Sequence, residues 1–150
     1  MNKQRKVIFI FIFLFIFMIG GLFLNQFFAK EHEAKIVIDR FYYFEQNGNF
    51  SNSWAMFHPY MKEKFSKAHY LQDRVHVFFN HFGVDTFEYH VGELKEINGW
   101  IFEEGFDPID VYSAPVTKTF KSKYGNFTIT QNVYAAKVQG EWTILWDYKK

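Results

Sequence analysis

Apolar residues fill the chain from Val7 to Leu24 without one charged or strongly polar side chain. As a helix, these 18 residues would extend roughly 27 Å, close to the hydrocarbon thickness of a bilayer. Phe and Ile alternate here, but both are apolar, so the segment lacks the polar face of a half-buried strand. A lone span must also satisfy its own backbone hydrogen bonds, which favours a helix. With Phe27 and Phe28 at its far end, the pattern predicts a transmembrane helix over residues 7–28.

Positive charge precedes this segment. Residues 1–6 contain Lys3, Arg5 and Lys6, and the positive-inside rule keeps such a tail in the cytoplasm. A cleaved signal peptide is the alternative, but its apolar region is usually shorter and ends in a small-x-small site, whereas here Phe27 stands two positions before Ala29. We therefore predict a retained anchor in the cell membrane, with the N-terminus in the cytoplasm and the C-terminal domain outside.

Helical spacing of apolar residues resumes after a short link over residues 29–33. Positions 34, 37, 38, 41 and 44 are apolar and predict a helix that ends at Asn47-Gly48. A short second helix, with Ser51 or Ser53 as its N-cap, is predicted before Pro59, and another turn or two after it. Leu71, Val75, Phe78, Phe79 and Phe82 share one face of a third helix over residues 68–83.

The remaining pattern alternates as strands do. Strands are predicted over 86–91, 109–120, 126–138 and 141–148, and Gly92 is expected to shift the phase as a bulge. Asn98-Gly99 indicates a hairpin, and Pro115 indicates a sheet edge or a bulge. Turns are predicted over 123–126 and at Gln139-Gly140. Helices followed by antiparallel strands indicate an α+β fold: a transmembrane helix, then three helices on a curved antiparallel sheet of four to five strands in one domain, residues 34–150.

This order of elements, closing on the strand Glu141-Trp142-Thr143-Ile144-Leu145-Trp146-Asp147, resembles the nuclear transport factor 2-like superfamily. It is also similar to the N-terminal domain of methicillin-resistance-type penicillin-binding proteins. The resemblance covers about Ala34 to Asp147 and implies a cone-shaped domain, often with a hydrophobic pocket. Gly48-Asn49 departs from the Gly-Asp that many relatives carry after the first helix.

Charge and composition exclude several classes of function. Beyond the predicted anchor, the chain has 14 basic and 16 acidic residues, so it offers no basic surface for nucleic acid. It has no cysteine, which excludes disulfides, cysteine nucleophiles and thiolate metal sites. The outer domain must therefore be stabilised by its hydrophobic core, and 26 of the 34 aromatic residues lie beyond Phe28.

Two polar groupings are candidates for chemistry. His69, Asp73, His76 and Asn80 have helical spacing and form one stripe that could bind a metal. The stripe lies opposite the apolar face of the helix, so we interpret it as a solvated surface and expect no metal or other cofactor.

The second grouping depends on the resemblance. Isomerases and dehydratases of this fold use Asp, His or Tyr inside the cone, and the positions that could correspond are Tyr89, His90, Asp110, Tyr112 and Asp147. We interpret them as polar residues of the sheet surface, and no catalytic residue is assigned.

Aromatic residues are expected both in the core and on the surface. Trp54, Phe57, Phe78, Phe87, Tyr89, Trp142 and Trp146 are predicted to be interior. The run Phe41-Tyr42-Tyr43-Phe44 surrounds much of one helix and cannot face a single core, so it predicts exposed aromatic surface and a partner.

These observations predict a membrane-anchored, extracytoplasmic binding or assembly module of the cell envelope, without catalytic activity. Its partners would be the lipid bilayer, through residues 7–28, and an envelope protein or a second copy of itself. The layout resembles bitopic subunits of conjugative and type IV secretion machines and accessory domains of cell-wall enzymes. The alternatives are a small-molecule-binding domain that uses the cone pocket and, less favoured, an enzyme of the isomerase or dehydratase type.

Overall fold

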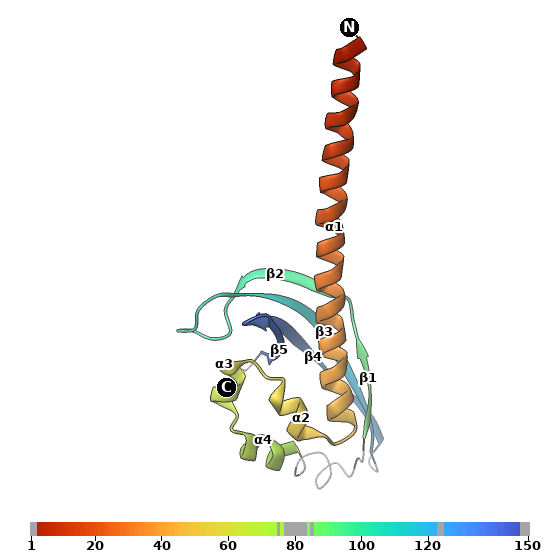
Figure 1. The fold of residues 1–150 in the computed structure, drawn as a ribbon. Helices are drawn as coiled ribbons and strands as arrows, with labels where there is room; N and C mark the ends of the chain where they lie inside the picture. Colours follow the sequence, from red (N-terminus) through yellow and green to blue (C-terminus); the bar gives the residue numbers. More distant parts are fainter. Residues whose placement is uncertain (1–2, 75, 77–83, 85, 123–124, 148–150) are drawn as a thin grey trace. The chain divides into compact units, whose positions relative to one another are not determined.

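The computed structural model describes residues 3–74, 76, 84, 86–122 and 125–147, with only the backbone of residues 3–11 and 21–28. The chain divides into two compact units, residues 1–33 and 34–150. Helix α1, Lys3–Gln46, contributes to both units (Figure 1). Residues 29–33, expected as a short link, are helical and belong to α1.

In the first unit, the described side chains from Ile12 to Met18 are all large and apolar, and each is at least 50% exposed. Within the described part of the chain, no helix combines the length and the apolar content that a membrane crossing requires. Positions 7–11 and 21–28 of the predicted membrane helix lie outside the residues whose side chains are described.

The second unit contains a five-stranded antiparallel sheet, which confirms the predicted α+β class and the number of strands. Its strands are β1 (Phe87–Val91), β2 (Lys95–Trp100), β3 (Ile109–Ser122), β4 (Gly125–Val138) and β5 (Glu141–Trp146). Strand β3 pairs with β4 from Tyr112 to Ser122, and β5 pairs with the C-terminal half of β4. On the other edge of β3, β2 and β1 pair one after the other.

Pro115 lies in central strand β3, at the point between the stretches that pair with β2 and with β1. Proline has no backbone N–H, so this interruption costs no ladder hydrogen bond. The Pro115 carbonyl instead accepts a hydrogen bond of 2.9 Å from the backbone N–H of Gly92. A Cβ atom on Gly92 would lie 2.8 Å from Cγ of Pro115, which explains why a glycine joins β1 to β2.

The prediction of a hairpin turn at Asn98-Gly99 is wrong. Both residues lie within β2, where the register with β3 shifts between Ile97 and Trp100. Gly99 takes a φ of 67° there, and its N–H donates to the side chain of Asp110. The Asn-Gly pair therefore forms a bulge inside the strand, and the chain reverses only in the following loop, residues 101–108.

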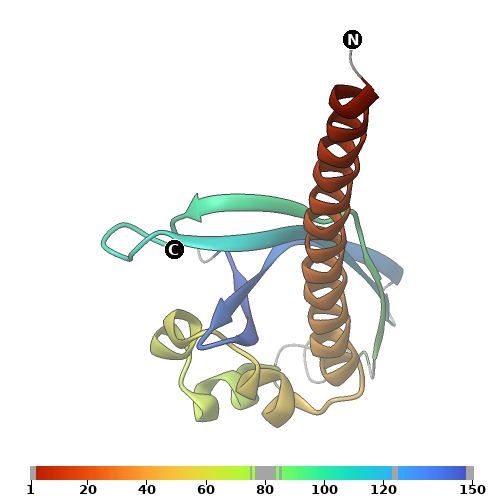
Figure 2. The ribbon, with the colours of Figure 1, turned by 45° about the horizontal axis from the view of Figure 1, so that its top comes forward.

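Helices α2 (Phe50–Ala55), α3 (Pro59–Lys64) and α4 (Lys67–Arg74) follow α1 and lie together on one side of the sheet (Figure 2). The described part of this unit thus has four helices where three were expected, because α3 forms a separate element. Ser51 and Ser53 are not N-caps, since α2 begins at Phe50 and is preceded by Asn49. The rest of the predicted third helix lies outside the described residues except His76, as do the turn residues Lys123 and Tyr124.

Aromatic rings fill the space between the helices and the sheet. Phe57 lies within 5.5 Å of Phe41, Tyr70 and Trp146, measured between ring centroids. Of the aromatics predicted to be interior, Phe57, Phe87 and Trp146 are buried, Trp54, Tyr89 and Trp142 are half-buried, and Phe78 lies outside the described residues. The exposed aromatic surface predicted on the first helix is present, because Tyr43 is 56% exposed.

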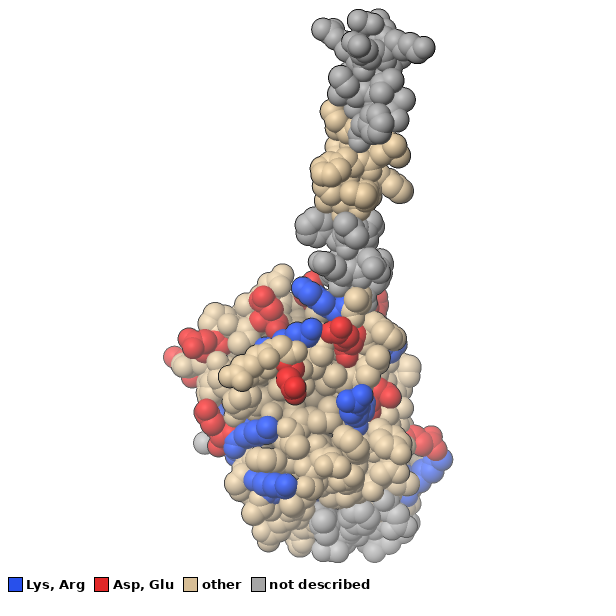
Figure 3. Space-filling model, in the orientation of Figure 1, with Lys and Arg blue, Asp and Glu red and all other residues tan. Residues whose placement is uncertain are grey.

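Charges of both signs are interspersed over the described surface that Figure 3 presents. This mixture agrees with the nearly balanced count of acidic and basic residues in the sequence. Any recognition by charge must therefore involve small groups of residues and not a broad field.

Candidate functional site

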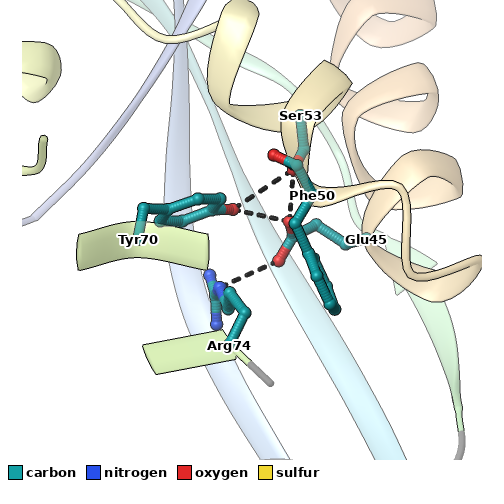
Figure 4. A network of polar contacts seen from close by, with 5 residues as sticks. All are labelled: Glu45, Phe50, Ser53, Tyr70 and Arg74. Carbon is teal, nitrogen blue, oxygen red and sulfur yellow. Dashed lines mark hydrogen bonds and ion pairs between the residues drawn. The ribbon is translucent and has the colours of Figure 1, made fainter. Parts of the chain in front are cut away.

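A buried carboxylate joins three helices in the second unit. Glu45 of α1 is 5% exposed, and its Oε1 accepts hydrogen bonds of 2.5 Å from the hydroxyls of Ser53 on α2 and Tyr70 on α4 (Figure 4). Its other oxygen, Oε2, lies 3.1 Å from Nε of Arg74, at the end of α4. Both carboxylate oxygens thus have partners, as a buried charge requires.

Among the described residues, two cations share this interior with the Glu45 carboxylate. The Arg74 guanidinium lies 4.8 Å from the ring centroid of Trp146, and Lys118 of β3, 5% exposed, points its ammonium toward the ring of Tyr42 at 5.9 Å. Burial, and then repulsion by Arg74, lower the pKa of Lys118 to about 8, although Glu45 partly offsets this effect. Burial also raises the pKa of the Tyr70 hydroxyl.

The interior network consists of four side chains that contact one another: Glu45, Ser53, Tyr70 and Arg74. Tyr70, Trp146 and Phe57 contribute both to the aromatic packing and to the surroundings of the ionic groups. The network fixes α1, α2 and α4 against one another, and the described side chains already satisfy its carboxylate. Its geometry is that of a structural polar core.

An open groove of about 1010 Å³ lies elsewhere on the same unit. One wall is α1, the second is α2 with the start of α3, and the third is the turn between β4 and β5. The lining residues are Val37, Arg40, Phe44, Asn52, Ala55, Met56, Phe57, Pro59, Lys62, Val138, Gln139, Gly140, Glu141, Trp142 and Thr143. Aromatic and aliphatic walls with a few charged groups are typical of a binding surface.

The described lining of this groove includes three charged residues. Arg40 is exposed and has no ion-pair partner among the described residues, and neither has Glu141. The Lys62 ammonium donates to the Ala55 carbonyl at 2.9 Å and lies 5.3 Å from the ring centroid of Trp54. The groove therefore offers a free guanidinium and a second cation close to apolar walls.

The turn at the edge of the groove is strained. Gln139 has a φ of 52° and Gly140 a φ of 88°, so both central residues of the β4–β5 hairpin are left-handed. Gly normally occupies such a position because it has no Cβ atom to clash with the backbone, and Asn or Asp does so because its short polar side chain can hydrogen-bond locally. Strained residues gather at functional sites, which supports the groove as the candidate site.

The stripe predicted as a candidate metal site stays on the surface. His69 Nε2 and Asp73 Oδ2 are 3.3 Å apart, and both side chains are more than half exposed. His76 is also exposed, and Asn80 lies outside the described residues. Within the described ranges, no three His, Cys, Asp or Glu side chains are grouped closely enough to hold a metal ion.

Three of the five strand residues considered as catalytic candidates have separate hydrogen-bond partners within the described part of the chain. Tyr89 donates to the Asp39 side chain, Asp110 accepts from the Gly99 backbone, and Asp147 accepts from Tyr134. His90 is exposed, whereas Tyr112 is buried beside Trp142. The charged groups of the described interior are other residues, namely Glu45, Arg74 and Lys118.

Sequence reasoning missed the residues of the interior network. Ile38, Phe41 and Glu45 are spaced by three and four positions, so Glu45 occupies the apolar stripe of its helix. Tyr70 and Arg74 are likewise four positions apart. A charge in an apolar stripe is a signal for a buried ion pair, but the sequence does not identify its partner.

Comparison of the chain with models of known protein families finds no match, and comparison with curated proteins finds none either.

Proposed function

We propose that this protein is a membrane-anchored, extracytoplasmic binding or assembly module of the cell envelope, and that the groove between α1, α2 and the β4–β5 turn is its binding surface. The observation that carries the proposal is the contrast between the two candidate regions. Aromatic rings and a fully hydrogen-bonded Glu45 carboxylate occupy the interior, whereas the groove is open and presents an Arg40 guanidinium that has no ion-pair partner among the described residues. In this proposal the domain belongs to the nuclear transport factor 2-like type.

The anchor in this proposal is the apolar segment of residues 7–28 behind the basic tail. Ile, Phe, Leu and Val each favour insertion by a few tenths of a kcal/mol, so 18 such positions sum to several kcal/mol. The described side chains of residues 12–18 expose large apolar groups that water solvates poorly, which agrees with a lipid environment.

The alternatives need an accessible interior pocket. A small-molecule binder or an isomerase requires room for its ligand beside the polar groups, and among the described hydrogen bonds Glu45 with Tyr70 is the one fully buried pairing of a carboxylate with a tyrosine. Since Ser53 and Arg74 also engage this carboxylate, a ligand would have to displace contacts that already exist. The open groove supports the binding-module proposal better.

Membrane anchoring is tested by fractionation of cells that express the full-length chain. We expect the chain to remain in the membrane pellet after alkaline carbonate extraction and to be degraded by protease added outside intact cells. Replacing Ile12 and Ile16 with Lys should release much of it, because each lysine near the centre of a span costs about 3 kcal/mol. A wild-type chain found in the soluble fraction would refute the anchor.

Binding through the groove is tested by photo-crosslinking in intact cells. A benzophenone amino acid replaces Phe44, which lines the groove, or Tyr43, which is its exposed neighbour outside the lining. We expect a reproducible protein adduct from position 44 and much less of it from position 43. Equal adducts from both positions, or none from position 44, would rule out the groove as the binding surface.

A further inference from the structure

We propose that the groove binds the acidic β2–β3 loop, residues 101–108, of a second copy of this chain. This inference rests on the proposed function and names the partner of the same groove. The juxtaposition that carries it is a free guanidinium in an aromatic-walled groove on one surface of the domain and a rigid loop with two free carboxylates on another.

The loop extends beyond the ends of β2 and β3 in both ribbon views (Figures 1 and 2). It contains three acidic residues, and red atoms mark the corresponding edge of the space-filling view (Figure 3). Glu103 pairs with Lys64 of α3. Glu104 and Asp107 are exposed and have no ion-pair partner within the described part of the chain.

The base of the loop is fixed. Trp100 stacks on Tyr134 with ring centroids 4.2 Å apart, and Phe106 packs against Tyr60 at 4.7 Å. These contacts hold the loop on α3 of its own copy, so it leaves the groove of that copy open. A loop that is already ordered loses little conformational entropy on docking.

The exposed part of the loop matches the chemistry of the groove. The carboxylates of Glu104 and Asp107 are complementary to the cations of Arg40 and Lys62. Ile101 is 55% exposed, and the apolar walls formed by Phe44 and other lining residues would shield such a side chain from water. Glu141, the first residue of β5, is the one acidic residue of the described lining, which also holds the two cations.

Anchoring would favour this contact. Copies in the same membrane share one orientation and diffuse in two dimensions, which raises their effective concentration. Loop and groove are separate surfaces, so the contact can be reciprocal across a two-fold axis or can continue around a ring.

The contact is tested with engineered cysteines, since the natural chain has none. Two tagged forms of the full-length chain, one with Glu104→Cys and the other with Glu141→Cys, are expressed in the same membranes and oxidised mildly. We expect a disulfide-linked product carrying both tags. A pairing of Glu104→Cys with Glu93→Cys, an exposed position outside the groove, is the matched control and should give about tenfold less product.

Charge-reversal variants then test whether the groove recognises the loop by charge. Arg40→Glu or Asp107→Arg in both tagged forms should lower the cross-linked fraction about tenfold, and the two changes together should restore it. Lys35→Glu, on an exposed position of α1 outside the lining, should have little effect. Urea unfolding of each variant shows whether it is folded.

The outcomes separate the two proposals. A groove that photo-crosslinks to a different protein, without the disulfide between positions 104 and 141, would overturn the self-docking inference and leave the binding module intact. A groove that yields no adduct of either kind would overturn both. If Arg40→Glu and Asp107→Arg each lower the cross-linked fraction and the double variant does not recover it, docking of this loop by charge is also contradicted.

Discussion

Glu45 Oε2 and Arg74 Nε lie 3.1 Å apart, between side chains that are 4% and 14% exposed. This pair connects the last turn of α1 to the end of α4, 29 positions later in the chain. An ion pair so far from water depends on complete hydrogen bonding, which Ser53 and Tyr70 provide at the other carboxylate oxygen. The packing of the helices and the ionisation of the interior are thus coupled.

Removing the negative charge should destabilise the domain strongly. In Glu45→Gln, Arg74 keeps its burial but loses its anionic partner, and we expect the free energy of unfolding to fall by about 3–5 kcal/mol. Urea unfolding followed by tryptophan fluorescence measures the change. Glu88→Gln is the control, because its pair with Lys121 is exposed and should contribute less than about 1 kcal/mol. Equal losses in both variants would contradict a special role for the buried pair.

The buried Lys118 should make stability depend on pH. Its pKa falls from 10.5 to about 8 on folding, so between these values the unfolded chain binds more protons than the folded one. The free energy of unfolding should therefore rise from pH 8 to about pH 9.5 and stay flat just below pH 8 with respect to this group.

Urea titrations at several pH values measure the slope. Lys118→Met should flatten it, whereas Lys121→Met, on an exposed position of the same strand, should preserve it. The comparison ends below pH 10, because burial raises the pKa of Tyr42 and Tyr70 above 10, so that their titration lowers stability at higher pH. A slope that persists in Lys118→Met would show that another group causes it.

Replacing Gln139 should relieve the strain in the β4–β5 turn and stabilise the domain. Gln139→Asn places a residue that accepts a left-handed backbone at a φ of 52°, and we expect a gain of about 0.5–1 kcal/mol in thermal or urea unfolding. Gln131→Asn, within β4, tests the effect of the side chain and should not stabilise. If the strain serves binding, the stabilised variant will also show less photo-crosslinking at position 44.

The contact between Gly92 and Pro115 should be sterically tight. Gly92→Ala places a methyl group 2.8 Å from the Pro115 ring, and the expected cost is about 1–3 kcal/mol. In a Pro115→Ala background the ring atoms are gone, so the same change should cost about 1 kcal/mol less. Additive effects in this double-mutant cycle would show that the backbone, and not the ring, sets the cost.

The sequence by itself determined the class of fold, because periods of 3.6 and 2 depend only on which neighbouring residues face the same side. It located β1 to within one residue, the Gln139-Gly140 turn and, on α1, the exposed Tyr43. It also gave the charge balance and the absence of cysteine chemistry, since both are counts.

Tertiary structure decided the rest. The local sequence Asn98-Gly99 predicts a turn, but pairing with β3 continues past these residues, so they form a bulge. Ser53 reads as a helix cap, but the approach of α4 and Glu45 makes it part of a buried network. The groove likewise combines α1, α2 and a turn some 80 positions beyond α2, and no local pattern encodes contacts between segments so far apart.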